Sequence, residues 1–297
     1  MTIVLAGGSG FLGRKLATRL RTAGHRTLTL TRRSARGPDD VQWAPDGTPE
    51  QLAPHLEGVE AVVNLAGEAI ADGRWTEAKK DAIRRSRVQA TRTLARAVAA
   101  CARPPRAFIS ASGVGYYGPR GDETITESRE PGSDFLARVC VEWEHEARAV
   151  ESPQTRLAIV RTGLVLDRDE GALAKMLPPF RLGLGATLGT GEQYMPWIHV
   201  DDWTAMAEWL IANDRVAGAF NACAPAPVTN RTFTKTLAGV LRRPALLHIP
   251  AVALRIGLGE LSTALLTGQR ALPAHAEQQG FRFTYRALDP ALRSLNL

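Results

Sequence analysis

Long apolar runs are missing from this sequence of 297 residues. No window approaches ~18 uninterrupted apolar residues, so no transmembrane helix is expected. The first five residues carry no basic stretch and run directly into glycines, which predicts a first strand rather than a signal peptide. Hydrophobic residues make up 44% and charged residues 23% of the chain, a composition that excludes intrinsic disorder and favours a globular core.

Cysteines are few, and their arrangement excludes two classes of site. Cys101, Cys140 and Cys223 are odd in number and widely spaced, with no CxxC pair. Neither a disulfide framework nor a zinc site is predicted, and the histidines show no ligand spacing that would indicate another metal. A reduced, cytoplasmic protein is the expectation.

A basic tail is also absent, although the formal net charge is +7. The 37 basic residues, all but five of them arginine, are dispersed along the chain. No basic stripe carries the interleaved aromatic residues that are typical of single-strand binding, so no nucleic-acid partner is expected. A small anionic ligand would use the positive surplus equally well.

The first half of the chain alternates strand and helix signals. Short apolar runs predict strands, and segments with helical spacing of apolar residues lie between them. The predicted strands are Thr2–Ala6, Thr27–Thr31, Ala61–Leu65, Ala107–Ser110 and Leu157–Arg161; the predicted helices are Phe11–Ala23, Thr76–Ala102 and Asp134–Val150. This order indicates an α/β fold of the Rossmann type, with a doubly wound parallel sheet covered by helices on both faces.

The pattern changes after Leu166. Gly183–Gly191 is too rich in glycine for a helix, Trp197–Val200 and Phe220–Cys223 resemble strands, and Ala251–Leu266 is mostly helical. Asp201 or Asp202 can cap a helix that runs to Ala212, and Asn230 can cap another over 231–243. We expect residues 1–166 and about 197–223 to form a dinucleotide-binding domain. Residues 167–196 and 224–297 are expected to form a smaller α+β cap that binds substrate.

A glycine-rich segment follows the first strand. Residues 7–13 read GGSGFLG and satisfy GxGxxG from Gly8 and GxxGxxG from Gly7. Gly10 would let a pyrophosphate approach the chain, Gly13 would let the helix pack on the strand, and the helix N-terminus would offer free N–H groups. The segment therefore predicts a dinucleotide site, the alternative being a glycine turn without a ligand.

The end of the second strand indicates which dinucleotide. An NAD site places Asp or Glu there, whereas this chain reads Thr31-Arg32-Arg33. A guanidinium can pair with a 2′-phosphate that a carboxylate would repel. Arg32 therefore predicts NADP(H), unless its side chain is simply solvated.

Several motifs resemble one known family. Residues 64–67 (NLAG), 110–118 (SASGVGYYG) and 197–202 (WIHVDD) are similar to the extended short-chain dehydrogenase/reductase superfamily. Arg74-Trp75, Ser86-Arg87, Trp143-Glu144 and residues 266–270 (LTGQR) more narrowly resemble the YfcH-like, NAD(P)-dependent epimerase-family proteins. The resemblance spans the chain and implies an NADP-binding Rossmann domain with a smaller C-terminal cap. It implies no particular substrate.

The usual superfamily chemistry uses Ser, Tyr and Lys, the last two as YxxxK. None of the four tyrosines is followed by Lys at that spacing, and the region after Asp134 reads FLARVC. Ser112 matches the catalytic serine position at the end of a strand, and Tyr116 or Tyr117 could replace the missing acid. Turn formation and packing under the cap are the alternatives for these residues.

The remaining candidates follow from the loop, the strand ends and the resemblance. The expected cofactor contacts are Gly7, Gly10, Phe11, Leu12, Gly13, Thr31, Arg32, Leu65, Ala66, Gly67, Arg87 and Val165. The expected substrate contacts are Glu68, Arg74, Trp75, Gln193 and Trp197. Arg87 could instead be a salt-bridging helix residue, and Trp197 could instead be core. His199 with Asp201 is expected to be a buried hydrogen-bonded pair.

Two functions are compatible with these features. The first is an NADP(H)-dependent reductase or epimerase-like enzyme that acts on an unidentified small molecule. The second is a non-catalytic NADP(H)-binding sensor that lost YxxxK. A homodimer is possible, and neither a membrane nor a nucleic-acid partner is expected.

Overall fold

A computed structural model describes all residues, 1–297. Its main feature is one parallel sheet of seven strands in the order β12-β7-β5-β4-β1-β2-β3. The strands are β1 (Thr2–Ala6), β2 (Arg26–Thr31), β3 (Asp40–Gln42), β4 (Ala61–Asn64), β5 (Ala107–Gly113), β7 (Arg156–Thr162) and β12 (Gly218–Ala222). From β3 inward this is the Rossmann order, which reverses direction between β1 and β4 and leaves a ligand crevice there.

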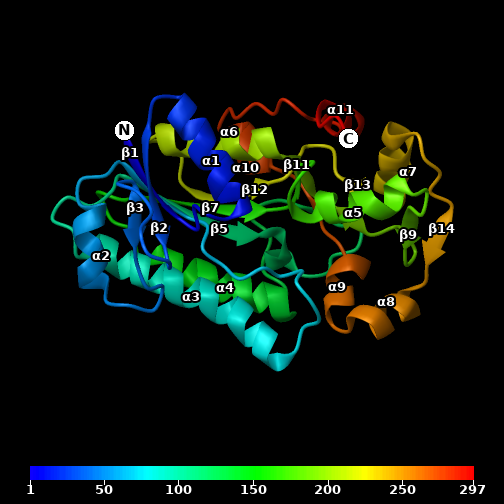
Figure 1. The fold of residues 1–297 in the computed structure, drawn as a ribbon, viewed down its shortest axis with the longest axis horizontal. Coiled ribbons are helices and arrows are strands. Elements are labelled where there is room, and N and C mark those ends of the chain that lie inside the picture. Colours follow the sequence, from blue (N-terminus) through cyan, green and yellow to red (C-terminus); the bar gives the residue numbers. More distant parts are fainter.

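Helices cover both faces of the sheet (Figure 1). Apolar residues of α1 (Phe11–Thr22) and α6 (Val200–Ala212) fill a core on one face. On the other face, α2 (Pro49–Leu56), α3 (Glu77–Ala99) and α4 (Phe135–Arg148) do the same. Burial on both faces explains why β1 and β4 are almost continuously apolar. The predicted α/β class is confirmed.

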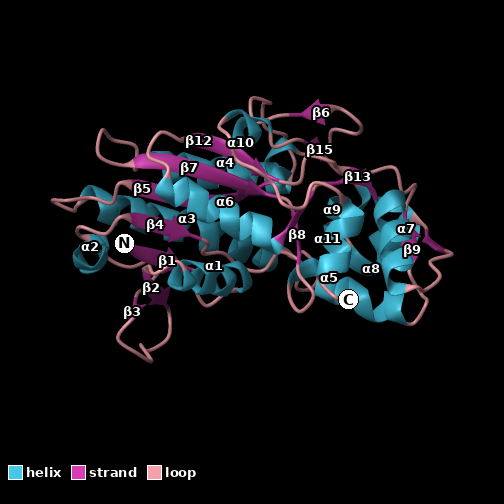
Figure 2. Ribbon diagram, turned by 90° about the horizontal axis from the view of Figure 1, so that it is seen from above, coloured by secondary structure: helices cyan, strands magenta, loops and turns pink.

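The rest of the chain forms the smaller C-terminal cap, which lies at one end of the molecule (Figure 2). Its helices are α5 (Gly171–Arg181), α7 (Asn230–Leu241), α8 (Ala251–Leu258), α9 (Leu261–Leu266) and α11 (Leu288–Ser294), and α10 (Ala274–Gln278) packs back against β12. A separate core joins α5, α7 and α11. The domain boundaries given above stay a prediction.

Short strand pairs connect the cap to the sheet domain and fasten the cap internally. They are β8 (Leu164–Leu166) with β11 (Trp197–His199), β6 (Thr124–Ile125) with β15 (Arg270–Ala271), β9 (Ala186–Leu188) with β14 (Leu247–Ile249), and β10 (Tyr194–Met195) with β13 (Val228–Thr229). A 3-10 turn, η1 (Val114–Tyr117), follows β5 directly.

Two predicted helix caps are wrong by one or a few residues. Helix α6 starts at Val200, and His199 rather than an aspartate caps it by accepting the Asp201 N–H. Helix α7 starts at Asn230, and its cap is Thr229, which accepts the Thr232 N–H. Asp202 serves another purpose: its carboxylate accepts the N–H groups of Thr284 and Tyr285 and holds the C-terminal segment.

No helix of the structure is both long enough and apolar enough to cross a membrane.

Candidate functional site

A crevice opens where the sheet order reverses, and we call it the nucleotide crevice. It encloses about 440 Å³. Parallel pairing aligns Ala6 with Asn64 and Asn64 with Ser110, so the ends of β1, β4 and β5 lie side by side. The crevice is lined by Gly7, Ser9, Gly10, Leu30, Thr31, Arg32, Trp43, Pro45, Asp46, Leu65, Ala66, Gly67, Glu68, Ser86 and Gln89.

The three glycines of the first turn do not all serve the same purpose. Gly7 has φ +78°, and a Cβ there would lie 2.6 Å from the Leu65 oxygen. A Cβ on Gly13 would lie 2.3 Å from the Gly7 oxygen, so these two glycines are required by the fold. A Cβ on Gly10 would meet only the Gly7 oxygen, at 3.2 Å, so this glycine keeps the crevice open rather than the fold intact.

Helix α1 begins in this turn without a side-chain cap. Its first backbone N–H groups have no partner within the helix, and they carry the positive end of the helix dipole. An uncapped helix start beside an open glycine is the arrangement that binds a phosphate group.

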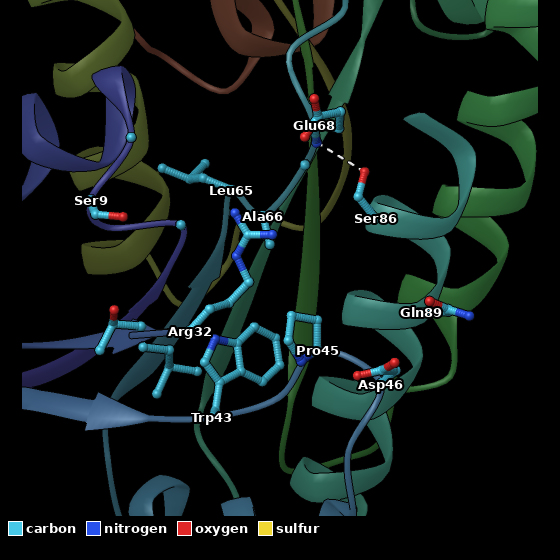
Figure 3. Close-up of a pocket in the computed structure, with 15 residues that line it drawn as sticks. Ser9, Arg32, Trp43, Pro45, Asp46, Leu65, Ala66, Glu68, Ser86 and Gln89 are labelled. Atoms are coloured by element: carbon cyan, nitrogen blue, oxygen red, sulfur yellow. Dashed lines mark hydrogen bonds between the residues drawn. The ribbon is translucent and has the colours of Figure 1, made fainter. Parts of the chain in front are cut away.

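Arg32 reaches into the crevice from the end of β2. Figure 3 shows its side chain beside Trp43, with the guanidinium directed toward Leu65 and Ala66. Arg32 forms no ion pair, and no carboxylate occupies the corresponding strand end. Asp46 is the acid that lines this part of the crevice, and it comes from the loop after β3.

The segment after β4 forms the opposite wall. Ser86 of α3 accepts the Glu68 N–H at 2.9 Å, as drawn in Figure 3, and Arg87 donates to the Glu68 oxygen at 3.0 Å. The Glu68 carboxylate pairs with Lys79 at 2.8 Å. Glu68 lines the nucleotide crevice, and its predicted contact with a substrate stays a prediction.

Arg87 is almost fully buried, with 8% of its surface exposed. It forms no ion pair, and it donates to the carbonyl oxygens of Glu68 and Ile83. Burial lowers the pKa of Arg87, because the loss of hydration outweighs the nearby charge of Glu68. A Cβ on Gly67 would lie 3.0 Å from the Arg87 Cζ, so Gly67 provides the space that this guanidinium occupies.

Five predicted cofactor contacts do not line the crevice: Gly13 and Arg87, described above, and Phe11, Leu12 and Val165. Phe11 and Leu12 pack against the core that contains Val165. The Phe11 ring also lies against Gly171, where a Cβ would come within 3.1 Å of the ring. These side chains support the first turn of α1, and their contact with a dinucleotide stays a prediction.

Ser112 belongs to a buried polar network. Its hydroxyl donates to the Glu144 carboxylate at 2.8 Å, and Arg161 donates to the same carboxylate with Nε and Nη2, both at 2.8 Å. Arg161 Nη1 donates to the Tyr117 hydroxyl at 2.9 Å. The Tyr117 hydroxyl in turn donates to Asn221 at 2.7 Å.

The two tyrosines of η1 differ in exposure. Tyr117 is fully buried, and burial raises its pKa to about 12. Tyr116 is partly exposed, its ring centroid lies 3.5 Å from the Arg161 Cζ, and burial also raises its pKa. Both phenols are therefore protonated near neutral pH, and of the two only Tyr116 is partly exposed.

A second hollow of about 460 Å³, the cap pocket, lies between η1, the start of α4 and α9. Trp75 lines it, whereas Arg74 donates to the Ile256 oxygen at the cap surface. Gln193 lines a third hollow of about 600 Å³, which we call the acidic hollow.

Trp197 and His199 lie in the interior. Trp197 has no exposed surface and donates to the Ala226 oxygen, so it is core, as the alternative interpretation held. His199 Nδ1 accepts the Asp201 N–H, but the Asp201 side chain is 65% exposed, so the expected buried pair is wrong for Asp201. The His199 ring lies against Tyr285 at an angle of 32°, with centroids 3.9 Å apart. Burial lowers the pKa of His199, which favours the neutral ring.

No group of three or more His, Cys, Asp or Glu side chains is arranged to hold a metal ion.

Comparison with known proteins identifies the family. The model of the NAD dependent epimerase/dehydratase family matches residues 3–223, and a domain of unknown function, DUF1731, matches residues 249–295. The chain belongs to the NAD dependent epimerase/dehydratase family.

Relatives within this epimerase family match the whole chain. It is 40% identical to epimerase family protein YfhF of Bacillus subtilis, over 99% of this chain and 98% of the relative. Epimerase family protein SDR39U1 of Homo sapiens is 34% identical, over 99% of both chains. The crystal structure of human SDR39U1 with NADPH superimposes with a TM-score of 0.92, at 33% identity over 99% of both chains.

Two groups of residues in this family member are not predicted by the sequence patterns. Trp43, Pro45 and Asp46 of the nucleotide crevice follow a strand of three residues that has no apolar pattern. Arg161 and Glu144 form the second group. The sequence patterns assign Arg161 to a strand and turn and Glu144 to a family motif, but they do not predict that the two side chains pair. The sequence signal that could have indicated a buried, paired Arg161 is its position as a charged residue in an otherwise apolar strand.

Proposed function

We propose that the chain is an NADP(H)-dependent oxidoreductase that transfers hydride to or from a carbonyl or hydroxyl carbon of a small molecule. The nucleotide crevice carries this proposal, because it combines an uncapped helix start at Gly10 with Arg32 and no strand-end acid. The likeness to SDR39U1, whose structure contains NADPH, supports it.

The residues of the crevice fit this cofactor. The first turn of α1 would hold the pyrophosphate, and Gly10 leaves the room for it. Arg32 would pair with the 2′-phosphate, while Leu65, Ala66 and Gly67 would contact the adenosine side. When bound, NADPH supplies the hydride.

The chain's own groups must then supply a proton or a hydrogen bond. Tyr116 is protonated near pH 7 because burial raises its pKa, so it can donate a proton but is a poor base. The Ser112 hydrogen is already directed to Glu144, which leaves the Ser112 oxygen as an acceptor. This arrangement favours reduction over oxidation at neutral pH.

A non-catalytic NADP(H) sensor is the second candidate. The observation that favours it is that Ser112 and Tyr117 bond to Glu144 and Asn221 rather than facing an open pocket. The absence of YxxxK agrees with it.

A turnover screen separates the two candidates. Carbonyl compounds are tested for NADPH oxidation by wild type, Tyr116→Phe, Ser112→Ala and Tyr117→Phe. We expect Tyr116→Phe to lower kcat by about a hundred- to ten-thousandfold, the usual worth of a positioned acid, with NADPH affinity unchanged. Tyr117→Phe is the matched control, since its hydroxyl bonds inside the protein.

A larger loss of kcat in Tyr117→Phe than in Tyr116→Phe would make Tyr117 the proton donor. If no compound is turned over, and NADPH instead changes the protease sensitivity of the cap, the sensor is the correct function. A homodimer and a cytoplasmic location belong to the same proposal, and gel filtration and cell fractionation test them.

A further inference from the structure

The cap pocket has an aromatic and aliphatic wall. Trp75 and Phe135 meet edge to face with ring centroids 5.2 Å apart, and Val114, Leu136 and Ala264 complete the apolar surface. The Trp75 indole donates to the Ile70 oxygen at 2.9 Å, which fixes the ring. Fixed aromatic side chains favour ligands that present a ring or a flat apolar face.

Charged side chains at this pocket are already engaged by the protein. The Asp134 carboxylate accepts the Ala137 N–H at 2.8 Å as the cap of α4. Glu260 pairs with Lys80 at 2.9 Å, and Arg138 donates to the Ser133 oxygen. Arg138 and Asp134 have no ion-pair partner, but they are opposite in sign, so the wall offers little net charge to a ligand.

The neutral polar groups are engaged in a similar way. Gln269 donates to the Gly118 oxygen at 2.9 Å, and the Thr267 hydroxyl donates to the Thr263 oxygen at 2.8 Å. The Thr263 hydroxyl forms no hydrogen bond within the chain and remains for a single polar group of a ligand.

The position of the pocket connects it with the reactive end of the sheet. Val114 and Gly115 line it, and they follow Ser112 at the carboxyl end of β5. Phe135 and Leu136 stand in the region where YxxxK would fall, so the wall that would carry the phenol is apolar here.

The neighbouring acidic hollow restricts which chemical groups of a ligand could extend beyond the cap pocket. The two hollows share Thr267, and Asp122 and Glu192 line the acidic hollow, whose lining contains no Arg or Lys. Glu192 is paired with Arg231 at 3.1 Å, whereas Asp122 forms no ion pair. A diphosphate placed there would meet the Asp122 carboxylate and no unpaired cation of the lining, which disfavours it.

We propose that the cap pocket binds a neutral, ring-bearing carbonyl or hydroxyl compound and excludes nucleoside-diphosphate sugars. This rests on the proposed function, because the compound would be the substrate of the same reaction. UDP-glucose is the contrasting ligand, because it carries two phosphates and is bound in two structures of the same fold at 19% and 16% identity.

Calorimetry with 1-tetralone, a neutral bicyclic ketone, and with UDP-glucose tests the proposal on the NADPH-loaded protein. The blocking variant is Ala264→Trp, which adds a ring to the pocket wall at an exposed position of α9. The matched control is Leu265→Trp, the next residue, which is 39% exposed and does not line the pocket.

We expect 1-tetralone to bind wild type and Leu265→Trp alike, and Ala264→Trp to weaken it by about tenfold or more, equal to roughly 1.4 kcal/mol. UDP-glucose should show no binding. No binding of 1-tetralone, equal binding to both variants, or UDP-glucose binding that Ala264→Trp abolishes would each overturn the proposal. NADPH is titrated first, so a chain that binds NADPH but not 1-tetralone contradicts this inference and leaves the NADP(H) site intact.

Discussion

The nucleotide crevice and the Ser112 network differ in how their polar groups are satisfied. In the crevice, Arg32 has no ion pair, and behind its wall buried Arg87 bonds only to backbone oxygens and has no carboxylate within ion-pair distance. In the network, buried Arg161 shares a carboxylate with Ser112, and every polar group bonds to another one. The difference indicates that the crevice is prepared for an anionic ligand, whereas the network holds its own structure together.

The largest expected effect concerns the crevice alone. Gly10→Val should leave the fold intact, because a Cβ there approaches only the Gly7 oxygen, at 3.2 Å. The valine would stand in the path of the pyrophosphate, so NADPH binding should fall below detection by calorimetry. The control is circular dichroism of both proteins; a folded variant that still binds NADPH normally would show that this turn is not the phosphate site.

The network should respond in the opposite way. Arg161→Met leaves the Glu144 carboxylate buried without its ion pair, and breaking such a pair costs about 3–5 kcal/mol of unfolding free energy. Urea denaturation measures this loss. Replacing both residues, with Glu144→Leu added to Arg161→Met, should recover much of it, because an apolar pair has no charge to desolvate. A loss below about 1 kcal/mol in the single variant would mean that water reaches the pair.

Arg87 gives the smallest change in stability and the sharpest contrast with Arg161. Arg87→Met removes a buried charge that has no carboxylate partner, so the unfolding free energy of the ligand-free protein should stay level or rise by about 1 kcal/mol. NADPH affinity should fall at the same time, because the positive charge beside the crevice is lost. A destabilisation as large as that of Arg161→Met, with unchanged NADPH affinity, would make Arg87 a structural residue.

The nucleotide crevice could largely be predicted from the sequence, whereas the Ser112 network could not. The strands of the sheet are apolar runs between helical segments, and the glycines and Arg32 follow directly from their ends, so local patterns are enough to predict the crevice. The pairing of Glu144 on α4 with Arg161 on β7 depends on how a helix packs across the sheet, and no local pattern records it.

Trp197 shows the limit for single side chains. An aromatic residue in a pocket wall and one in a core have the same sequence signal, and only the packing of β11 on β8 shows that Trp197 is buried. Trp43 shows the converse, because it lines the crevice directly after a short strand, β3, that no periodic pattern predicts.

The central claim is that the crevice binds NADP(H) through Arg32. Calorimetric titration of NADPH and NADH into wild type and Arg32→Ala tests it most directly. We predict tighter binding of NADPH than of NADH to wild type, by about ten- to a hundredfold, which is the worth of a charge-assisted hydrogen bond of about 1.5–3 kcal/mol. Arg32→Ala should remove that preference and leave NADH binding unchanged. Equal affinities in wild type, or a preference that survives Arg32→Ala, would contradict the account.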